Sequence, residues 1–237
     1  MIEVFNEYVN NYDMNNPKIK LKYDHSIRVT ELSLKYAKML NFSEEDINLA
    51  YVIGLLHDIG RFEQAKRFDS FVDLETIDHG DLGCEILFEE NIIEKFNIDE
   101  KYYEIIKKAI RNHNKHEIES GLNEKELLHA KLIRDTDKLD ILYNMAYLKQ
   151  IKAISTDEEI SPLVLEDVKN KRSVNNKHIK NENDKIARTF TFAFNIYNDI
   201  CLKEVKEYFE VIYENLEHKE KIKEVYDMVI SYIDKKI

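Results

Sequence analysis

The chain has 237 residues, enough for one sizeable core, and only 5 glycines and 2 prolines. So few turn residues exclude the turn-rich sandwiches and barrels and favour an all-α fold. The net charge of −11 would repel a phosphate backbone, so duplex nucleic acid is not an expected partner.

The chain carries no sign of export or of membrane insertion. Its first residues, MIEVFNEYVNNYDM, are acidic and lack both a basic region and an apolar run. The longest apolar run, LAYVIGLL, is far too short to span a bilayer. Two cysteines, Cys84 and Cys201, do not make a disulfide framework. We therefore expect a cytoplasmic protein that has no membrane partner.

Helical periodicity begins early in the chain. Apolar residues from Ile27 to Leu40 predict a first helix, for which Asp24 is a candidate cap. A second helix is expected over residues 43–60, because Ser43 and Asp46 have capping-box spacing and Gly60 stands where a helix would stop. Its body is apolar nearly all round, which is typical of a helix in the centre of a core.

Residues 61–77 mix basic and aromatic side chains without periodicity, so they predict a loop or short irregular helix that could serve as a lid. From Asp78 a further helix is expected, on which Gly83 would let another backbone approach beside His79. The next helix runs from about Glu100 to His113 and is broken by residues 114–123.

The second half of the chain is predicted to be helical as well. A helix is expected over residues 124–149, followed by an exposed loop over 169–185 and then by terminal helices, of which the last runs from about Leu202 to Ile237. No solenoid repeat and no Pro- or Gly-rich linker interrupts this pattern.

The adjacent pair His57 and Asp58 carries the first chemical signal. It ends the apolar helix, where a buried carboxylate beside an imidazole is costly unless something compensates it, and a bound cation is the simplest compensation. Neighbouring residues on a helix point about 100° apart, so both can bind one ion only near a helix end or with a particular pair of rotamers. Mixed imidazole and carboxylate ligands suit Mn, Fe, Co, Ni or Zn, and Mg is also allowed.

Three phrases of the sequence resemble the HD superfamily of metal-dependent phosphohydrolases. They are His25 in DHSIRV, the pair in GLLHDIGR and an aspartate in RDTDKLD, and the resemblance covers about residues 22–149. It implies an HD-domain helical bundle with additional C-terminal helices, and metal ligands His25, His57, Asp58 and Asp137. Asp137 is chosen because Thr136-Asp137-Lys138-Leu139 matches the family's phrase around its last ligand. Asp135 is the alternative, since it shares a mostly apolar helical face.

His79 and His113 resemble the second-metal ligands of dinuclear members of the superfamily. In those members an aspartate, here Asp58, and a hydroxide bridge two metals. The chain departs from the cyclic-dinucleotide phosphodiesterases, since Asn114 stands where a second adjacent histidine would be and the Gly-Tyr-Pro phrase is absent. The alternative for both residues is a histidine that only packs between helices, so one or two ions are possible.

Basic residues near the pair are candidates for binding phosphate. Arg61 stands where related sequences often carry a Lys or Arg, and a guanidinium matches the phosphate fork. The alternative is a solvated cation at a helix end. Lys66, Arg67 and Lys138 are further candidates.

Together these features predict two parts, an HD phosphohydrolase domain over 1–150 and a C-terminal helical extension over 151–237 packed on the same core. The expected reaction is attack of metal-activated water on a nucleotide or other small phosphate ester, with Asp58 and Arg61 as the catalytic residues. Two alternatives remain. One is a diiron oxygenase of the same superfamily, and the other is a non-catalytic module that binds a nucleotide. The oligomeric state is open.

Overall fold

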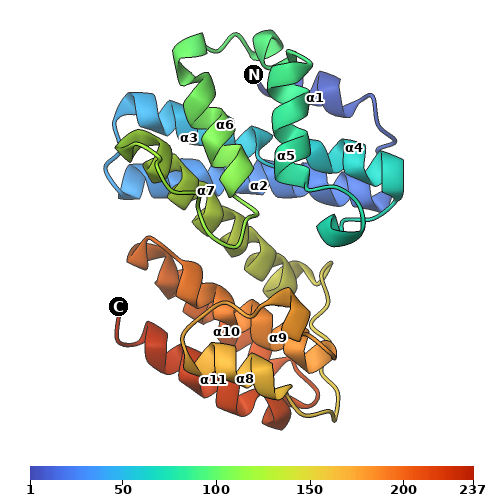
Figure 1. Ribbon diagram of the computed structural model, residues 1–237, viewed down its shortest axis with the longest axis vertical. Helices are drawn as coiled ribbons and strands as arrows, with labels where there is room; N and C mark the ends of the chain where they lie inside the picture. Colours follow the sequence, from blue (N-terminus) through green and yellow to red (C-terminus); the bar gives the residue numbers. More distant parts are fainter. The chain divides into compact units, whose positions relative to one another are not determined.

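The computed structural model describes residues 1–237 and contains helices but no β-strand, which confirms the predicted all-α class (Figure 1). The chain divides into two compact units, Met1–Asp137 and Lys138–Ile237, and the division falls inside helix α7. The domain boundary that we expect near residue 150 stays a prediction. None of the helices is both long enough and apolar enough to cross a membrane.

The first unit contains, in chain order, α1 (Ile2–Val9), α2 (Pro17–Met39), α3 (Glu44–Leu56), α4 (Ile59–Phe68), α5 (His79–Cys84), α6 (Tyr103–Asn112) and the start of α7 (Glu124–Tyr143). Short turns of helix lie between them at Asp73–Glu75, Glu85–Glu89, Ile92–Phe96 and Glu100–Tyr102. The second unit contains the end of α7, α8 (Pro162–Lys169), α9 (Glu182–Phe190), α10 (Leu202–Glu214) and α11 (Lys219–Ile233), with short turns at Asn144–Leu148, Asn176–His178, Thr191–Asn195 and Asp199–Cys201.

Helix α2 begins earlier than the apolar pattern predicts. Asn16 caps it by accepting a hydrogen bond from the Lys18 amide, and Pro17 occupies the first helical position, where its missing N–H costs nothing. Asp24 therefore lies inside the helix, and its predicted role as a cap is wrong. The consequence is that His25 lies near the middle of a long, rigid helix.

Helix α3 is the central helix that its composition predicts. Ser43 caps it, with its hydroxyl accepting a hydrogen bond from the Asp46 amide, and most of its residues are buried. A Cβ on Gly54 would lie only 2.9 Å from Thr30 Cα, so this glycine allows α2 and α3 to pack closely along one another. The close contact brings the middle of α2 near the end of α3.

The segment after the His-Asp pair is more regular than we expected. Ile59–Phe68 forms helix α4, whereas the sequence predicted a loop or short irregular helix over 61–77. The buried face of α4 includes polar Gln64 beside Phe62 and Ala65, and this polar residue conceals the helical pattern. Between the His-Asp pair and α5, only residues 69–78 are irregular, and they include one short helical turn at Asp73–Glu75.

Helices α4 and α5 pack against each other at two glycines. A Cβ on Gly60 would lie 2.4 Å from the His79 carbonyl oxygen and 2.7 Å from the Gly83 amide nitrogen. The expected close approach of backbones exists, but Gly60 is the residue that requires it, since a Cβ on Gly83 would meet only ordinary contacts. Gly60 lies in the first turn of α4 and therefore does not end a helix.

Two further features position the histidines of the first unit. Asp78 caps α5 by accepting hydrogen bonds from the Gly80 and Asp81 amides, so α5 opens at His79. Helix α6, which packs beside α5, ends at Asn112, directly before His113 (Figure 1).

The second unit has its own apolar core, to which Phe190 of α9, Phe209 of α10 and Val229 of α11 contribute. The single terminal helix predicted over Leu202–Ile237 is wrong, because residues 215–218 separate α10 from α11. Asn215 ends α10, and its backbone and side-chain amides both bond to carbonyl oxygens of the last turn.

Candidate metal centre

Asp58 lies between α3 and α4, and its two carboxylate oxygens face different pairs of histidines. Its Oδ2 atom is 3.3 Å from His25 Nε2 and 3.6 Å from His57 Nε2. Its Oδ1 atom is 3.3 Å from His79 Nε2 and 3.4 Å from His113 Nε2. The carboxylate therefore lies between two groups of potential ligands, each of which could hold a metal ion.

The first group contains His25 of α2, His57 at the end of α3, Asp58 and Asp137 of α7. The two histidine Nε2 atoms are 3.2 Å apart, and Asp137 Oδ1 is 3.1 Å from His25 Nε2. Asp137 therefore contacts the group as the family phrase implies. That it, rather than the fully buried Asp135, binds a metal stays a prediction.

The second group contains Asp58 Oδ1, His79 at the start of α5 and His113 after α6. The Nε2 atoms of these two histidines are 3.0 Å apart, and both side chains are buried. The structure thus brings both residues to Asp58, although they come from different helices and lie 34 positions apart.

The outer nitrogens of three histidines already have acceptors. His57 Nδ1 is 2.8 Å from the Gly54 carbonyl oxygen, and His113 Nδ1 is 2.6 Å from that of Ile110. His79 Nδ1 is 2.7 Å from the Asp73 carboxylate. Because carbonyl and carboxylate oxygens only accept, Nδ1 carries the proton in each case and Nε2 presents a lone pair to the centre.

This arrangement fits a cation. The lone pairs of His79 and His113 face each other, which is unfavourable unless a positive charge lies beside both. Protonation of His79 does not provide that charge, because burial lowers the pKa of His79 to about 4, even though Asp73 and Asp58 oppose the shift. Burial likewise lowers the pKa of His57 to about 3. Both rings are therefore neutral, as metal binding requires.

The spacing of the ligands also fits a metal. Metal–nitrogen bonds of about 2.1 Å in a tetrahedral arrangement separate neighbouring ligand atoms by roughly 3.4 Å. The separations within the first group run from 3.1 Å between His25 and Asp137 to 3.8 Å between His57 and Asp137. These separations therefore match the spacing of ligands around one ion.

Asp58 is ionised although it is buried. Burial by itself raises its pKa, but the positive charge of Lys22, together with its other polar neighbours, holds the pKa well below its usual value. A charged carboxylate between two histidine pairs could bind a cation on each side.

Asp73, in the irregular segment after α4, is a residue that the sequence reasoning missed. Its Oδ2 atom accepts from His79, while its Oδ1 atom accepts from Arg61 Nη1 and Gln64 Nε2 at 2.9 Å each. Burial raises its pKa, but the hydrogen bond from His79 and the charge of Arg61 lower the pKa by more than burial raises it. Asp73 thus fixes the ring of His79 and the guanidinium of Arg61 together.

Arg61 points from the first turn of α4 toward the centre. Its Nη1 atom also donates to Gln64 Oε1 and to the Phe71 carbonyl oxygen. Its Nε atom is buried without a hydrogen-bond partner and lies 3.8 Å from Asp58 Oδ1. An unpartnered donor at this place is available to an anion bound at the centre.

Lys22 is a second residue that the sequence reasoning missed. It precedes His25 by three positions on α2, and its Nζ atom donates to Asp58 Oδ2 at 2.6 Å. The spacing is the available signal, because residues three apart share a helical face.

Phosphate binding by the other basic candidates, Lys66, Arg67 and Lys138, stays a prediction. Lys66 and Arg67 are exposed and both approach the carboxylate of Glu63, so these contacts give no support to phosphate binding. Lys138 lies in the second unit. Asn114 donates to Asp73 and Asp78, and His116 is exposed, so neither replaces the missing second histidine.

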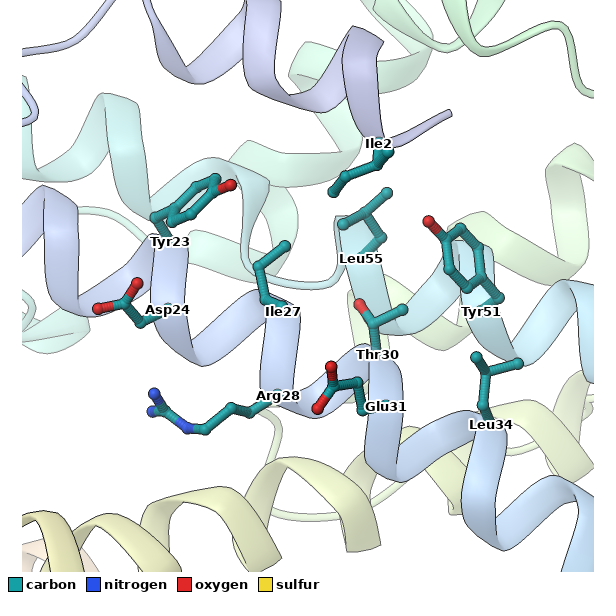
Figure 2. Close-up of a pocket in the computed structure, with 10 residues that line it drawn as sticks. All are labelled: Ile2, Tyr23, Asp24, Ile27, Arg28, Thr30, Glu31, Leu34, Tyr51 and Leu55. Atoms are coloured by element: carbon teal, nitrogen blue, oxygen red, sulfur yellow. The ribbon is translucent and has the colours of Figure 1, made fainter.

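A cleft of about 550 Å³ lies elsewhere in the first unit, between α1, α2 and α3 (Figure 2). Ile2, Ile27 and Leu55 approach one another on one side of α2, while Asp24, Arg28 and Glu31 point away from them. None of the histidines lines it, so the candidate chemistry does not lie in this cleft.

Comparison with known families agrees with the geometry. A family model described as HD domain matches residues 23–142, slightly more than half of the chain, and the match includes all six residues of the two groups. The chain belongs to the HD-domain family. It has no match among curated proteins and none among solved structures. HD domains bind divalent metal ions, and the two buried groups are consistent with this property.

Proposed function

We propose that this HD-domain protein is a metal-dependent phosphohydrolase that acts on a nucleotide or another small phosphate ester. The observation that supports this proposal most strongly is the position of Asp58, whose two oxygens face two separate histidine pairs. Six side chains, His25, His57, Asp58, His79, His113 and Asp137, would hold the metal.

A divalent cation held there would lower the pKa of a bound water to about 7 and would thereby supply a hydroxide nucleophile near neutral pH. The protein contributes the orientation of the ligands. The carbonyl oxygens of Gly54 and Ile110 and the carboxylate of Asp73 fix the rings of His57, His113 and His79, because each accepts the outer ring proton.

Arg61 would stabilise the phosphoryl group. Its buried, unpartnered Nε lies beside Asp58, and its Nη1 is held by Gln64, Phe71 and Asp73. A guanidinium fixed in this way needs little reorganisation when negative charge develops on phosphoryl oxygens. Asp73 therefore has a positioning role, through both Arg61 and His79.

The test begins with metal analysis of protein purified without added metal, followed by hydrolysis assays on nucleotides and other phosphate esters with Mn, Mg, Co and Ni. We expect metal-dependent release of phosphate, which His57→Ala and Asp58→Ala abolish while the far-ultraviolet circular dichroism is kept. His116→Ala is the matched control, because this exposed histidine lies outside both groups. Loss of metal-dependent hydrolysis in the control, or its retention in Asp58→Ala, would contradict the assignment.

A second candidate function uses the same ligands. Two histidine pairs around one carboxylate also suit a diiron oxygenase that acts on a small polyol or phosphonate, as in other members of the superfamily. Two irons per chain and turnover that stops without oxygen would favour this candidate. Tight nucleotide binding without turnover under any of these conditions would instead indicate a non-catalytic module.

A further inference from the structure

Lys22 is placed unusually for a lysine. Its side chain is 15% exposed, and its ammonium group bonds to Asp58 Oδ2, the oxygen that faces His25 and His57. Burying an ammonium group is costly without a paired anion. The paired anion is Asp58, the carboxylate that faces both histidine groups.

The same oxygen cannot serve two cations equally well. A carboxylate oxygen that binds a metal shares its negative charge and one of its lone pairs with that metal. With the first group loaded, Lys22 would therefore lie beside a divalent cation with its own charge only partly compensated. A further anion at this point would restore the balance.

Arg61 is the counterpart of Lys22 on the other side of Asp58. Lys22 Nζ lies 5.6 Å from the centre of the Phe71 ring, and Arg61 Cζ lies 5.4 Å from the same ring. Lys22 approaches Asp58 Oδ2, whereas Arg61 approaches Asp58 Oδ1. Each histidine group thus has one cation beside it, and both cations contact one aromatic ring.

We infer that Lys22 binds the phosphoryl group of the substrate together with Arg61, and that this group is the dianion of a phosphate monoester. The inference rests on the proposed function. A phosphoryl group lying over Asp58 would meet one cation at each end. Two cations in addition to the metal suit the two negative charges of a monoester better than the single charge of a diester.

The test measures binding of inorganic phosphate to the Mn-loaded protein by calorimetry, in the wild type and in Lys22→Gln. We expect phosphate to bind about 10- to 100-fold more weakly to Lys22→Gln, because one charged contact is lost. Mn²⁺ should bind to this variant at least as tightly as to the wild type, since a competing positive charge is removed. Dimethyl phosphate, which carries one negative charge, should bind to the wild type at least 10-fold more weakly than phosphate.

Two further variants separate the role of Lys22 from general effects. Lys22→Arg keeps the charge and should recover most of the phosphate affinity. Lys20→Gln is the matched control, because Lys20 lies on the same helix, is 53% exposed and pairs with Asp24 instead of Asp58. It should bind phosphate like the wild type.

The possible failures are distinguishable. If Lys22→Gln binds phosphate as tightly as the wild type, or loses Mn²⁺ together with phosphate, the role of Lys22 is refuted while the proposed function stands. Equal affinity of the wild type for phosphate and dimethyl phosphate refutes the monoester class. If the wild type binds no phosphate and hydrolyses no ester, the proposed function and the inference both fall.

Discussion

Gly60→Ala should separate the two histidine groups. The new Cβ would lie 2.4 Å from the His79 carbonyl oxygen, whereas a carbon atom normally stays roughly 3.3 Å from such an oxygen. Helix α5 must then retreat by roughly 0.9 Å, and His79, its first residue, moves away from Asp58 with it. Overpacking of this kind costs about 1–3 kcal/mol, and a misplacement of about 1 Å reduces turnover by about 10²-fold.

The assay combines thermal melting, metal stoichiometry and hydrolysis, with Gly83→Ala as the control. A Cβ on Gly83 would meet its nearest neighbours at 3.4–3.5 Å, so this variant should be as stable as the wild type or slightly more so. Gly60→Ala should melt earlier and lose the metal of the second group before that of the first. Wild-type melting and wild-type metal content in Gly60→Ala would refute the reasoning.

Three further outcomes are expected. His79→Ala should halve the bound metal and reduce turnover severely, as metal analysis of the variant would reveal, whereas unchanged metal content would indicate a mononuclear site. In urea titrations the metal-free protein should lose at least about 3 kcal/mol of stability as the pH falls from about 6.5 toward 4, because His79 and His57 stay neutral when folded and are protonated when unfolded; a flat profile would contradict this. Arg134→Ala should lower the free energy of unfolding by about 3 kcal/mol in the same titrations, because the buried guanidinium donates to the carbonyl oxygens of Asn112, Lys115 and His116. A decrease below about 1 kcal/mol would refute that role.

The helical class was predictable because the signals that define it are local. The scarcity of glycine and proline, the capping box at Ser43 and the apolar body of α3 each depend on a few neighbouring residues. The start of α2 was missed, although Asn16-Pro17 is a strong helix-start signal, because the apolar pattern becomes regular only after Asp24. Helix α4 was missed because its buried face includes Gln64, whose amide is satisfied by Asp73, Thr76 and the Ile77 carbonyl oxygen.

The candidate site was predictable only in part. His25, His57, Asp58 and Asp137 stand in recognisable phrases, and His79 and His113 stand where dinuclear relatives have ligands. Lys22 and Asp73 stand in no such phrase. Lys22 contacts Asp58, which lies 36 residues further along the chain. Asp73 contacts His79, which lies 6 residues further along, beyond an irregular turn. Sequence spacing alone does not reveal such contacts.

The position of the helix break explains how two adjacent residues can serve one centre. Successive side chains on a continuous helix would diverge by about 100°. Asp58 has φ −105° and ψ 18°, outside the helical region, while His57 is still helical at φ −55° and ψ −37°. The chain therefore turns at the ligand itself rather than at Gly60. Because the turn is complete before Gly60, that glycine is free to meet α5, and the contact carries His79 to the second oxygen of Asp58. One irregular residue thus sets the geometry of both groups.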